Sequence, residues 1–368
     1  MPLLINTFPM TRVIFFVILT LLVTCCGSER RKSTNDASLV VPVTLKGSIV
    51  PVDGLPGSGF IGIREEGIIT KHFNLKQFGI QPFRYVEGKL VAQEPCARMG
   101  RGPFEFDLVS SNIQDDTLYL VNMQNIGGSV TDIYSIPLSP YDSIGNIKRW
   151  KRTELDWTEM RFYFGSFVWL DNGRLLMLSG EQDEDNFLTI VDTVSKKKIP
   201  LGYTLRDGMK VDALTKKFVY MQNVNLLRNG DKVVFPLGVG HYAEILTLDG
   251  NKITDRKLIY SELPEYEVRG DQFGFAHKEG TPMGIDACST SQYIYFQKKY
   301  YRKEGENGYP WYCEDEVEVY DWDGKFIRKY RTDVPFYTMI VSDDDREMYV
   351  MTVDRDTKDN IMMKYELL

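Results

Sequence analysis

The sequence predicts an all-β protein, a six-bladed β-propeller with four-stranded antiparallel blades. Three observations support this fold class. From residue 39 onward, Val, Ile, Tyr, Phe and Thr gather in short runs broken by Asp, Asn and Gly, which is typical of strands. No stretch shows the sustained i, i+3, i+4, i+7 spacing of a long amphipathic helix. A polar turn followed by an apolar strand recurs six times, at the even spacing of a repeat protein.

The composition indicates an ordinary folded protein. The chain has 368 residues, 43% hydrophobic and 26% charged, so its apolar content suffices to build a core. The formal net charge is −7 and no basic block is present. Because nucleic-acid affinity comes largely from Lys and Arg on phosphates, this balance argues against a nucleic-acid partner. The length allows two or three average domains or one large β domain.

Residues 1–24 are predicted to be a lipoprotein signal peptide. Arg12 precedes an unbroken apolar run over residues 13–23, which is the arrangement of a secretory signal. The run is too short for a comfortable membrane span of roughly 20 residues. A plain secretory signal and a short signal-anchor are the alternative interpretations.

The end of this run predicts a lipid anchor. Leu22-Val23-Thr24-Cys25 resembles a bacterial lipobox, in which a cysteine becomes the lipidated first residue of the mature protein. Cys25 is the predicted lipidation site. Cys26 is the alternative, because Thr is less usual just before the cleavage point. Acyl chains on this cysteine would hold the mature protein on a membrane.

The predicted domain organisation follows from this anchor. Residues 25–38 are polar and are expected to form a flexible tether, and residues 39–368 to form the propeller. The expected location is the bacterial cell envelope, at the outer membrane. The run after the cysteine is basic, whereas some surface-exported lipoproteins of Bacteroidetes carry an acidic one, so the periplasmic face is favoured over the cell surface.

The six recurring units each predict one blade. The polar turn and apolar strand of each unit are here called its anchor. Each anchor is preceded by a strand and followed by one or two more, often through an Asp-Gly hairpin such as Asp249-Gly250 or Asp323-Gly324. A seven-bladed ring and a pair of β-sandwiches are the alternatives, and the even spacing argues against a sandwich with a separate domain. The anchors are Glu66–Ile69, Asp115–Leu120, Asp171–Met177, Arg228–Phe235, Ser291–Phe296 and Asp343–Met351.

Closure of the ring is expected from the two ends of the predicted propeller. Stacked blades bury their apolar faces, and joining the first blade to the last removes the weak seam. Residues 39–52 are predicted to pair with the C-terminal strand at 360–368. Short helical turns are expected at 75–78 and 211–218.

A glycine-rich segment carries a family resemblance. Residues 100–106, Gly-Arg-Gly-Pro-Phe-Glu-Phe, resemble the GxGPxEF signature of the six-bladed propeller lipoproteins of Bacteroides and relatives, which are similar to TolB-like and NHL-like propellers. The usual signature has Gly where this chain has Phe104. The resemblance implies fold and location but no catalytic residues. The motif residues are Gly100, Gly102, Pro103, Glu105 and Phe106, and we interpret them as a structural loop, with ligand contact as the alternative.

Reactive side chains give no strong enzyme signal. His72, His241 and His277 are far apart in the sequence, and no hydrolase elbow or nucleotide-binding fingerprint is present. Beyond the signal, Cys96, Cys288 and Cys313 lack metal-binding or redox spacing, and each is interpreted as a small buried residue. A Cys288–Cys313 disulfide is the alternative.

The first strand of each predicted blade should face the central channel. Among the polar residues in these positions are Gln222, Asn223, Asn225 and Asp286. Some lactonase-like propellers hold a divalent metal with such groups. The alternative function is therefore a metal-dependent hydrolase or lyase, although no metal ligands are assigned and no cofactor is expected.

An aromatic loop suggests a binding surface instead. Tyr309, Trp311 and Tyr312 fall in a predicted long loop of the fifth blade, where exposed Tyr and Trp are typical binding anchors. Packing between blades is the alternative for these side chains. The favoured function is a monomeric envelope lipoprotein whose propeller acts as a binding or scaffold module for a protein or saccharide partner.

Overall fold

The computed structural model describes the chain from residue 40 to residue 367, with internal gaps. The predicted signal peptide and the predicted tether lie outside the described residues, which are 40–52, 55, 58–72, 78–100, 104–106, 108–123, 130–154, 166–179, 185–205, 211–222, 224–269, 272–275, 278–302 and 313–367. Within these ranges, no helix has the length and apolar character needed to cross a membrane.

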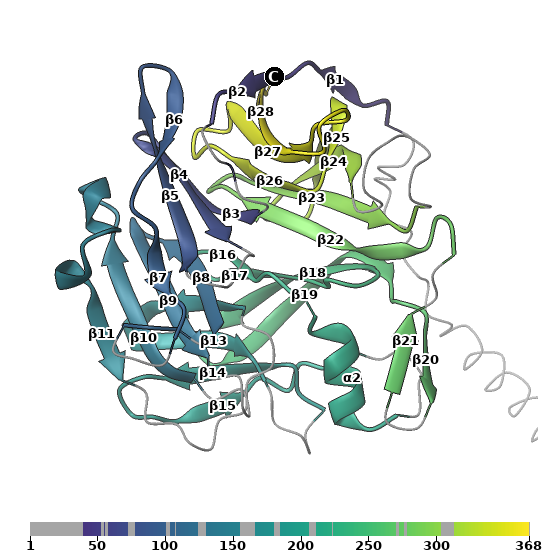
Figure 1. Ribbon diagram of the computed structural model, residues 1–368. Helices are drawn as coiled ribbons and strands as arrows, with labels where there is room; N and C mark the ends of the chain where they lie inside the picture. The colour runs from purple at the N-terminus through teal and green to yellow at the C-terminus, as the bar shows by residue number, and fades with distance from the viewer. Residues whose placement is uncertain are drawn as a thin grey trace, which may run out of the picture. The chain divides into compact units, whose positions relative to one another are not determined.

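Six four-stranded antiparallel sheets form the blades of a six-bladed propeller, as the sequence predicts (Figure 1). Blade 1 contains β3 (Ser58–Arg64), β4 (Gly67–His72), β5 (Phe78–Val86) and β6 (Lys89–Ala92), with β7 (Cys96–Arg98) pairing the beginning of β5. Blade 2 contains β8 (Leu108–Gln114), β9 (Thr117–Met123), β10 (Val130–Pro137) and β11 (Lys151–Glu154). Blade 3 contains β12 (Phe167–Leu170), β13 (Arg174–Leu178), β14 (Leu188–Asp192) and β15 (Lys198–Pro200).

The other three blades follow the same order from the inner to the outer strand. Blade 4 contains β16 (Leu227–Asn229), β17 (Lys232–Pro236), β18 (His241–Asp249) and β19 (Lys252–Glu262). Blade 5 contains β22 (Pro282–Ser289), β23 (Tyr293–Tyr300), β24 (Glu314–Asp321) and β25 (Phe326–Phe336). Blade 6 contains β26 (Thr338–Val341), β27 (Glu347–Val353), β28 (Asn360–Glu366) and, from the N-terminal side of the chain, β2 (Ser48–Val50).

All six sequence anchors mark the turn into the second strand of a blade, which confirms the predicted repeat and rules out the seven-bladed and sandwich alternatives. The second strands read as apolar runs because both of their faces are buried. Leu175, for example, packs into the cluster shared with blade 2, and the next residue, Leu176, into the cluster shared with blade 4. Val233 and Val234 divide in the same way between blades 3 and 5.

The core consists of six apolar clusters, one at each junction between neighbouring blades. The last of these joins Met351 and Met362 of blade 6 to Ile68 and Phe83 of blade 1, so the ring is closed by side-chain packing. Burial of each large aliphatic or aromatic side chain contributes about 1.5–3 kcal/mol, which makes these junctions the main source of stability.

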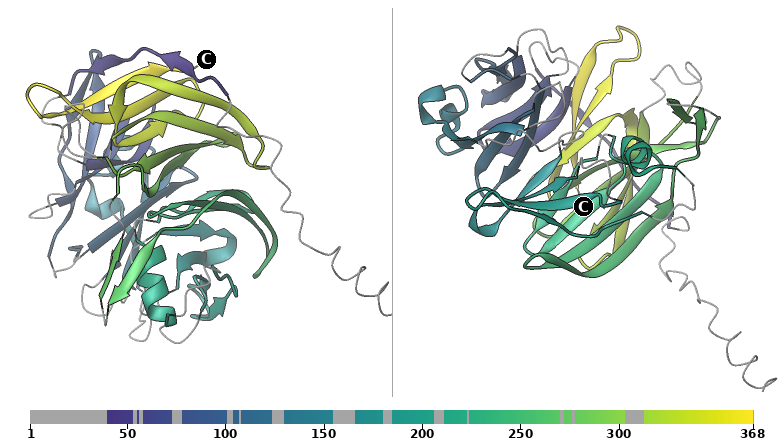
Figure 2. Two further views of the ribbon diagram at one scale, coloured as in Figure 1. Left: turned by 90° about the vertical axis from the view of Figure 1, so that its right-hand side faces the viewer. Right: turned by 90° about the horizontal axis from the view of Figure 1, so that it is seen from below.

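The ring is also closed by strand pairing, as predicted. β2 pairs antiparallel with β28, with Ile49 opposite Met363. β1 (Val43–Leu45), which the sequence did not predict, pairs parallel with β25 and adds a fifth strand to blade 5. The N-terminal strands therefore lie beside the C-terminal strands of two neighbouring blades (Figure 2). Between β1 and β2, the Gly47 amide donates to Asp333, 3.2 Å away.

Two further elements lie outside the blades. The helix α2 (Ala213–Tyr220) begins after Asp212, whose carboxylate accepts from the Thr215 amide. It falls where the sequence predicts a short helix over 211–218. The hairpin β20 (Tyr266–Arg269) and β21 (Gln272–Phe275) was not predicted and packs with α2 against the blade 3–4 cluster (Figure 1). The other expected helical turn, at 75–78, lies mostly outside the described residues, and Phe78 begins β5.

Gly67 gives a direct test of how closely the strands of blade 1 approach. A Cβ at this position would overlap the backbone carbonyl of Phe83, which cannot move without distorting the sheet. We expect Gly67→Ala to lower the free energy of unfolding by about 1–3 kcal/mol, measured by urea denaturation. Gly145→Ala is the matched control, because nothing lies within 4 Å of its added Cβ. Equal effects of the two substitutions would contradict this packing.

Candidate functional site

The inner strands of the blades surround the centre of the propeller with unpaired edges. β3, β8, β12, β16, β22 and β26 each stand at the end of their sheet and so pair with a neighbour on one side only. Their free backbone N–H and C=O groups require other partners, which side chains, water or a ligand can supply.

A cavity of about 470 Å³, here called the channel cavity, lies among five of these strands. It is lined by the inner strands of blades 1, 2, 4, 5 and 6 and by the turns that follow them. Its polar wall includes Arg64, Ser111, Asn112, Gln114, Asp115, Asp116, Asn225, Arg228, Asn229, Asp286, Ser289, Thr290, Ser291, Thr338 and Asp343. Its size lies within the range of ligand pockets, about 300–1,000 Å³.

One end of the cavity is bounded by polar contacts between the turns of neighbouring blades, here called the inter-blade belt. Arg64 of blade 1 lies 3.4 Å from Asp116 of blade 2 and 3.6 Å from Asp343 of blade 6. One guanidinium therefore links three blades. Both aspartates are largely exposed, so each ion pair contributes little free energy by itself.

The belt continues through blades 3, 4 and 5. Arg228 donates to the Trp169 carbonyl at 2.9 Å and lies 3.4 Å from Asp171. Asn229 donates to the Ser291 carbonyl at 2.7 Å. At the junction between blades 2 and 3, the contact is aromatic, and the rings of Tyr119 and Trp169 stack with centroids 5.0 Å apart.

Asp345 completes the belt between blades 5 and 6. Its Oδ1 accepts hydrogen bonds from Thr290 at 2.7 Å and from Tyr295 at 2.8 Å. Burial, together with this carboxylate, raises the pKa of Tyr295. Asp345 adopts a left-handed backbone with φ of 59°, which Asp and Asn tolerate better than other non-glycine residues.

The structure places two of the predicted channel residues, Asn225 and Asp286, in the wall of the channel cavity. The Asn225 amide donates to the Ala287 carbonyl at 3.4 Å and so covers part of the free edge of β22. Asn223 lies outside the described residues. Gln222 is not part of the wall, and its amide donates to the Phe218 carbonyl at the end of α2.

Three wall residues carry a buried polar atom that has no hydrogen-bond partner among the described residues. These atoms are Gln114 Oε1, Arg228 Nε and Asp286 Oδ2. Buried polar atoms are normally satisfied, so these three indicate positions that water or a ligand completes. Sequence reasoning did not single out Gln114 or Arg228, because they stand in the last positions before a turn and resemble ordinary turn residues.

The motif loop between blades 1 and 2 is held by internal contacts. The Gly100 amide donates to the Phe106 carbonyl, and the Phe106 amide donates to the Arg98 carbonyl, both at 2.9 Å. Glu105 lies 3.6 Å from Arg98, and Phe106 is fully buried. None of these residues lines the channel cavity, and Gly102 and Pro103 lie outside the described residues.

Phe104 has a backbone conformation that is unusual for a bulky side chain. It adopts a left-handed backbone with φ of 61°, a conformation that glycine takes without strain. Its ring packs against Tyr134 and Trp150, with centroids 5.5 and 6.5 Å apart. These aromatic contacts offset the backbone strain at this position.

The other candidate residues do not form a reactive cluster. Among the described side chains, no three His, Cys, Asp or Glu groups converge to hold a metal ion. His241 is buried, its Nε2 lies 2.8 Å from the Lys299 carbonyl, and burial lowers its pKa. The side chains of His72 and His277 are outside the described set. So are Tyr309, Trp311 and Tyr312, whose binding role stays a prediction.

The three cysteines of the propeller are free, so the alternative Cys288–Cys313 disulfide is absent. Cys96 and Cys313 are buried, and burial raises the pKa of each thiol to about 12. Because the thiolate is the reactive form, neither cysteine is activated as a nucleophile. Cys288 lines the channel cavity, and its pKa is also raised, first by burial and then by the charge of Asp286.

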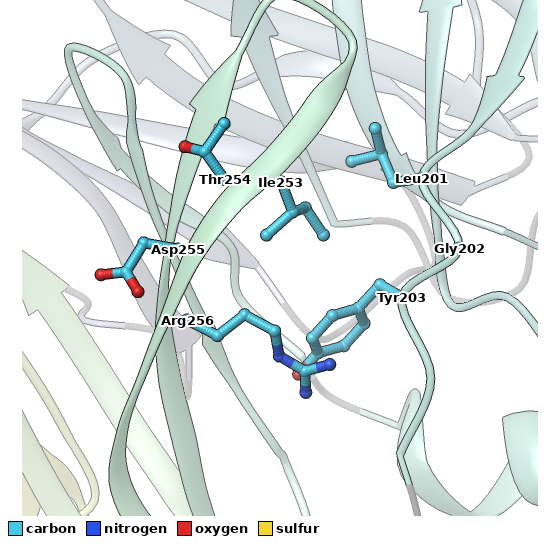
Figure 3. A pocket seen from close by; sticks show the side chains of 7 residues that line it. All are labelled: Leu201, Gly202, Tyr203, Ile253, Thr254, Asp255 and Arg256. Atoms are coloured by element: carbon cyan, nitrogen blue, oxygen red, sulfur yellow. The ribbon is translucent and has the colours of Figure 1, made fainter.

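A second, more open hollow lies at the outer side of blades 3 and 4 (Figure 3). This rim pocket measures about 500 Å³ and is lined by Leu201–Tyr203 and Ile253–Arg256. The Arg256 guanidinium lies over the Tyr203 ring, 4.5 Å from its centroid. Tyr203 and Arg256 both donate to one oxygen of the buried Glu244, at 2.7 and 2.8 Å. These groups satisfy one another and join blade 3 to blade 4.

The chain resembles known proteins in fold but not in sequence. No protein-family model matches the chain, and no curated protein matches it in sequence. A solved member of the DUF4221 family from Bacteroides vulgatus is similar in structure, with a TM-score of 0.55 and 12% identity, over 87% of this chain and 97% of that one. A protein of unknown function from Bacteroides thetaiotaomicron has a TM-score of 0.50 and 9% identity, over 87% and 75%.

A third solved structure, an auxiliary nutrient binding protein from Bacteroides thetaiotaomicron, has a TM-score of 0.48 and 12% identity, over 85% of this chain and 70% of that one. At these identities the likeness concerns the fold alone. The chain is a six-bladed β-propeller similar in fold to these Bacteroides proteins.

Substitution of Asp345 tests how much the inter-blade belt contributes to stability. We expect Asp345→Ala to lower the free energy of unfolding by about 2–4 kcal/mol, because it removes two hydrogen bonds to a charged acceptor and a residue suited to the left-handed backbone. Asp345→Asn keeps the backbone preference and an acceptor oxygen, so its loss should be less than half as large. Chemical denaturation of both variants measures the difference. An alanine variant as stable as the parent would show that the belt contributes nothing at this junction.

Proposed function

We propose that the protein is a cell-envelope lipoprotein whose propeller binds a small, polar, hydroxyl-rich ligand of the saccharide class in the channel cavity. The observation that carries this proposal is the cavity itself. Its wall combines hydrogen-bond donors and acceptors from five blades. Three residues of the wall carry a buried polar atom without a partner among the described residues.

The chemistry of the wall favours hydroxyl groups. A hydroxyl both donates and accepts, so a ligand with several of them can match amide, carboxylate, guanidinium and free backbone groups at once. The wall presents all of these, including Asn112, Gln114 and Asn225. An apolar ligand would leave the unpartnered atoms buried and unsatisfied, at a cost of about 1–3 kcal/mol for each.

The rigidity of the ring supports binding. Six apolar clusters fix the distances between the inner strands, so the wall is formed before a ligand arrives. A preformed site loses little conformational entropy on binding. The sequence also favours a protein partner. We propose that such a partner would bind the aromatic loop at Tyr309, Trp311 and Tyr312, and this part of the proposal rests on the sequence alone.

The channel is tested with defined sugars. We expect saturation-transfer NMR to detect binding of at least one of glucose, galactose, glucosamine, N-acetylglucosamine and their disaccharides to the full-length protein. Ser111→Trp places a large ring in the wall of the channel cavity and should abolish the signal, because it fills the space. Val194→Trp is the control, since Val194 is 82% exposed and lies away from the cavity wall. The proposal fails if no sugar binds, or if Ser111→Trp binds as the parent does.

The lipid anchor is tested in bacterial cells that process lipoproteins. We expect Cys25→Ser to abolish incorporation of an alkyne-labelled fatty acid and to release the protein from the membrane fraction. Cys26→Ser is the matched control and should leave both unchanged. Loss of labelling in the Cys26 variant alone would move the anchor to that residue. The absence of fatty-acid labelling in the parent protein would reject lipidation.

A further inference from the structure

We infer that the channel cavity selects ligands that carry a primary amine in its protonated form, and that Asp286 is the group that binds this amine. The inference rests on the proposed function and narrows it to hydroxylated amines such as hexosamines. Three observations lead to it: the charge balance of the wall, the position of Asp286, and the acceptors left unpartnered around it.

The charged side chains of the cavity wall are four aspartates and two arginines. Both arginines are already engaged by aspartates, Arg64 by Asp116 and Asp343, and Arg228 by Asp171. Asp115 is exposed and accepts a hydrogen bond from the Gln114 amide at 3.3 Å. Asp286 is therefore the wall carboxylate that stands away from the belt and has no cation within ion-pair distance among the described residues.

Asp286 lies in the middle of β22, between two buried residues. Ile285 and Ala287 point into the apolar cluster shared with blade 4, so Asp286 projects from the opposite face of the strand. Its Oδ2 is buried and unpartnered among the described residues. A carboxylate in this position attracts a cation more strongly than an exposed one, because less water screens its charge.

A second acceptor lies beside it. Gln297 is directly opposite Asp286 in the β22–β23 pairing, so the two side chains share one face of the sheet. Gln297 is fully buried, and its amide nitrogen is used by the carbonyls of Glu314 and Phe336. Its Oε1, like Asp286 Oδ2, has no donor among the described residues.

The nearest lysine on this face is committed elsewhere. Lys299, two residues along β23 from Gln297, donates to the Tyr337 carbonyl at 2.7 Å. Asp345 of blade 6 contacts the same face through Thr290 and Tyr295 and adds a second negative charge. On this face of the sheet, Asp286 supplies an unpartnered acceptor and a negative charge to the cavity wall, and Gln297 supplies a second unpartnered oxygen beside it, outside the wall itself.

A protonated amine fits this arrangement better than a hydroxyl does. An ammonium group has three donors and no acceptor, and its positive charge compensates the negative charge of the Asp286 carboxylate. A hydroxyl would supply one donor and leave the carboxylate charge uncompensated. Charge-assisted hydrogen bonds are about twice as strong as neutral ones, so the amine should be preferred at this position.

The test compares three sugars that differ at one substituent. Glucosamine carries a protonated amine at slightly acidic pH, glucose a hydroxyl, and N-acetylglucosamine a neutral amide. We expect isothermal titration of the full-length protein at pH 6.5 to give at least tenfold tighter binding of glucosamine than of glucose or N-acetylglucosamine. The preference should weaken as salt is added, because it is electrostatic.

Asp286→Asn keeps the shape of the side chain and removes its charge. We expect it to reduce glucosamine affinity at least tenfold while changing glucose affinity less than about threefold. Asp249→Asn is the matched control, because it removes an exposed carboxylate that is not part of the cavity wall, and it should preserve the preference. Asp286→Ser serves as a second variant, and the thermal melting of both variants shows that they are folded.

The outcomes separate the two proposals. Equal binding of the three sugars, or a preference that survives in Asp286→Asn, overturns the amine inference and leaves saccharide binding in the channel standing. If none of the three binds and the larger sugar panel also fails, the proposed function is wrong and the inference falls with it.

Discussion

The burial of both faces of each blade's second strand is the constraint on which the structure depends. A lone four-stranded sheet of this sequence would expose both of its apolar faces to water. Packing Leu175 toward one neighbour and Leu176 toward the other removes both faces from solvent, and it does so only if every blade has two neighbours. A closed ring satisfies that condition without leaving a seam, and the cluster that joins Met351 to Ile68 is where the ring closes.

The channel and its chemistry follow from this closure. Because the second strands hold the blades apart at fixed distances, the first strands are left with one unpaired edge each around the centre. Polar side chains from neighbouring blades cover part of these edges, as Asn225 does on β22. The inter-blade belt then fixes one end. Stability therefore comes mainly from the apolar junctions, whereas the polar groups near the centre define what can bind there.

Much of the fold could be predicted from the sequence, for a local reason. The polar turn and the two-sided apolar strand are both short-range patterns, so the blade repeat could be recognised without knowing which blades touch. The pairing of residues 39–52 with the C-terminal strand followed from the need to close the ring. β1 on β25 could not be foreseen, because three residues such as Val43–Leu45 carry no sign of their partner.

The site was predictable only in part. Counting along the repeat placed Asn225 and Asp286 on inner strands, and both line the channel cavity. The belt was missed because its members look like turn residues. Asp345 and Arg64 act through contacts with blades that are distant in the sequence, and no local pattern distinguishes a bridging aspartate from a solvated one. The left-handed backbone of Phe104 was not foreseen either, because bulky residues rarely adopt this conformation and the sequence gives no sign of it.

The measurement that tests the central claim most directly is a crystal structure of the protein grown with glucosamine. The account predicts a sugar in the channel cavity, with its amine within hydrogen-bond distance of Asp286 and its hydroxyls on the inner strands. A sugar found only in the rim pocket beside Tyr203 and Arg256, with ordered water alone in the channel cavity, would contradict it.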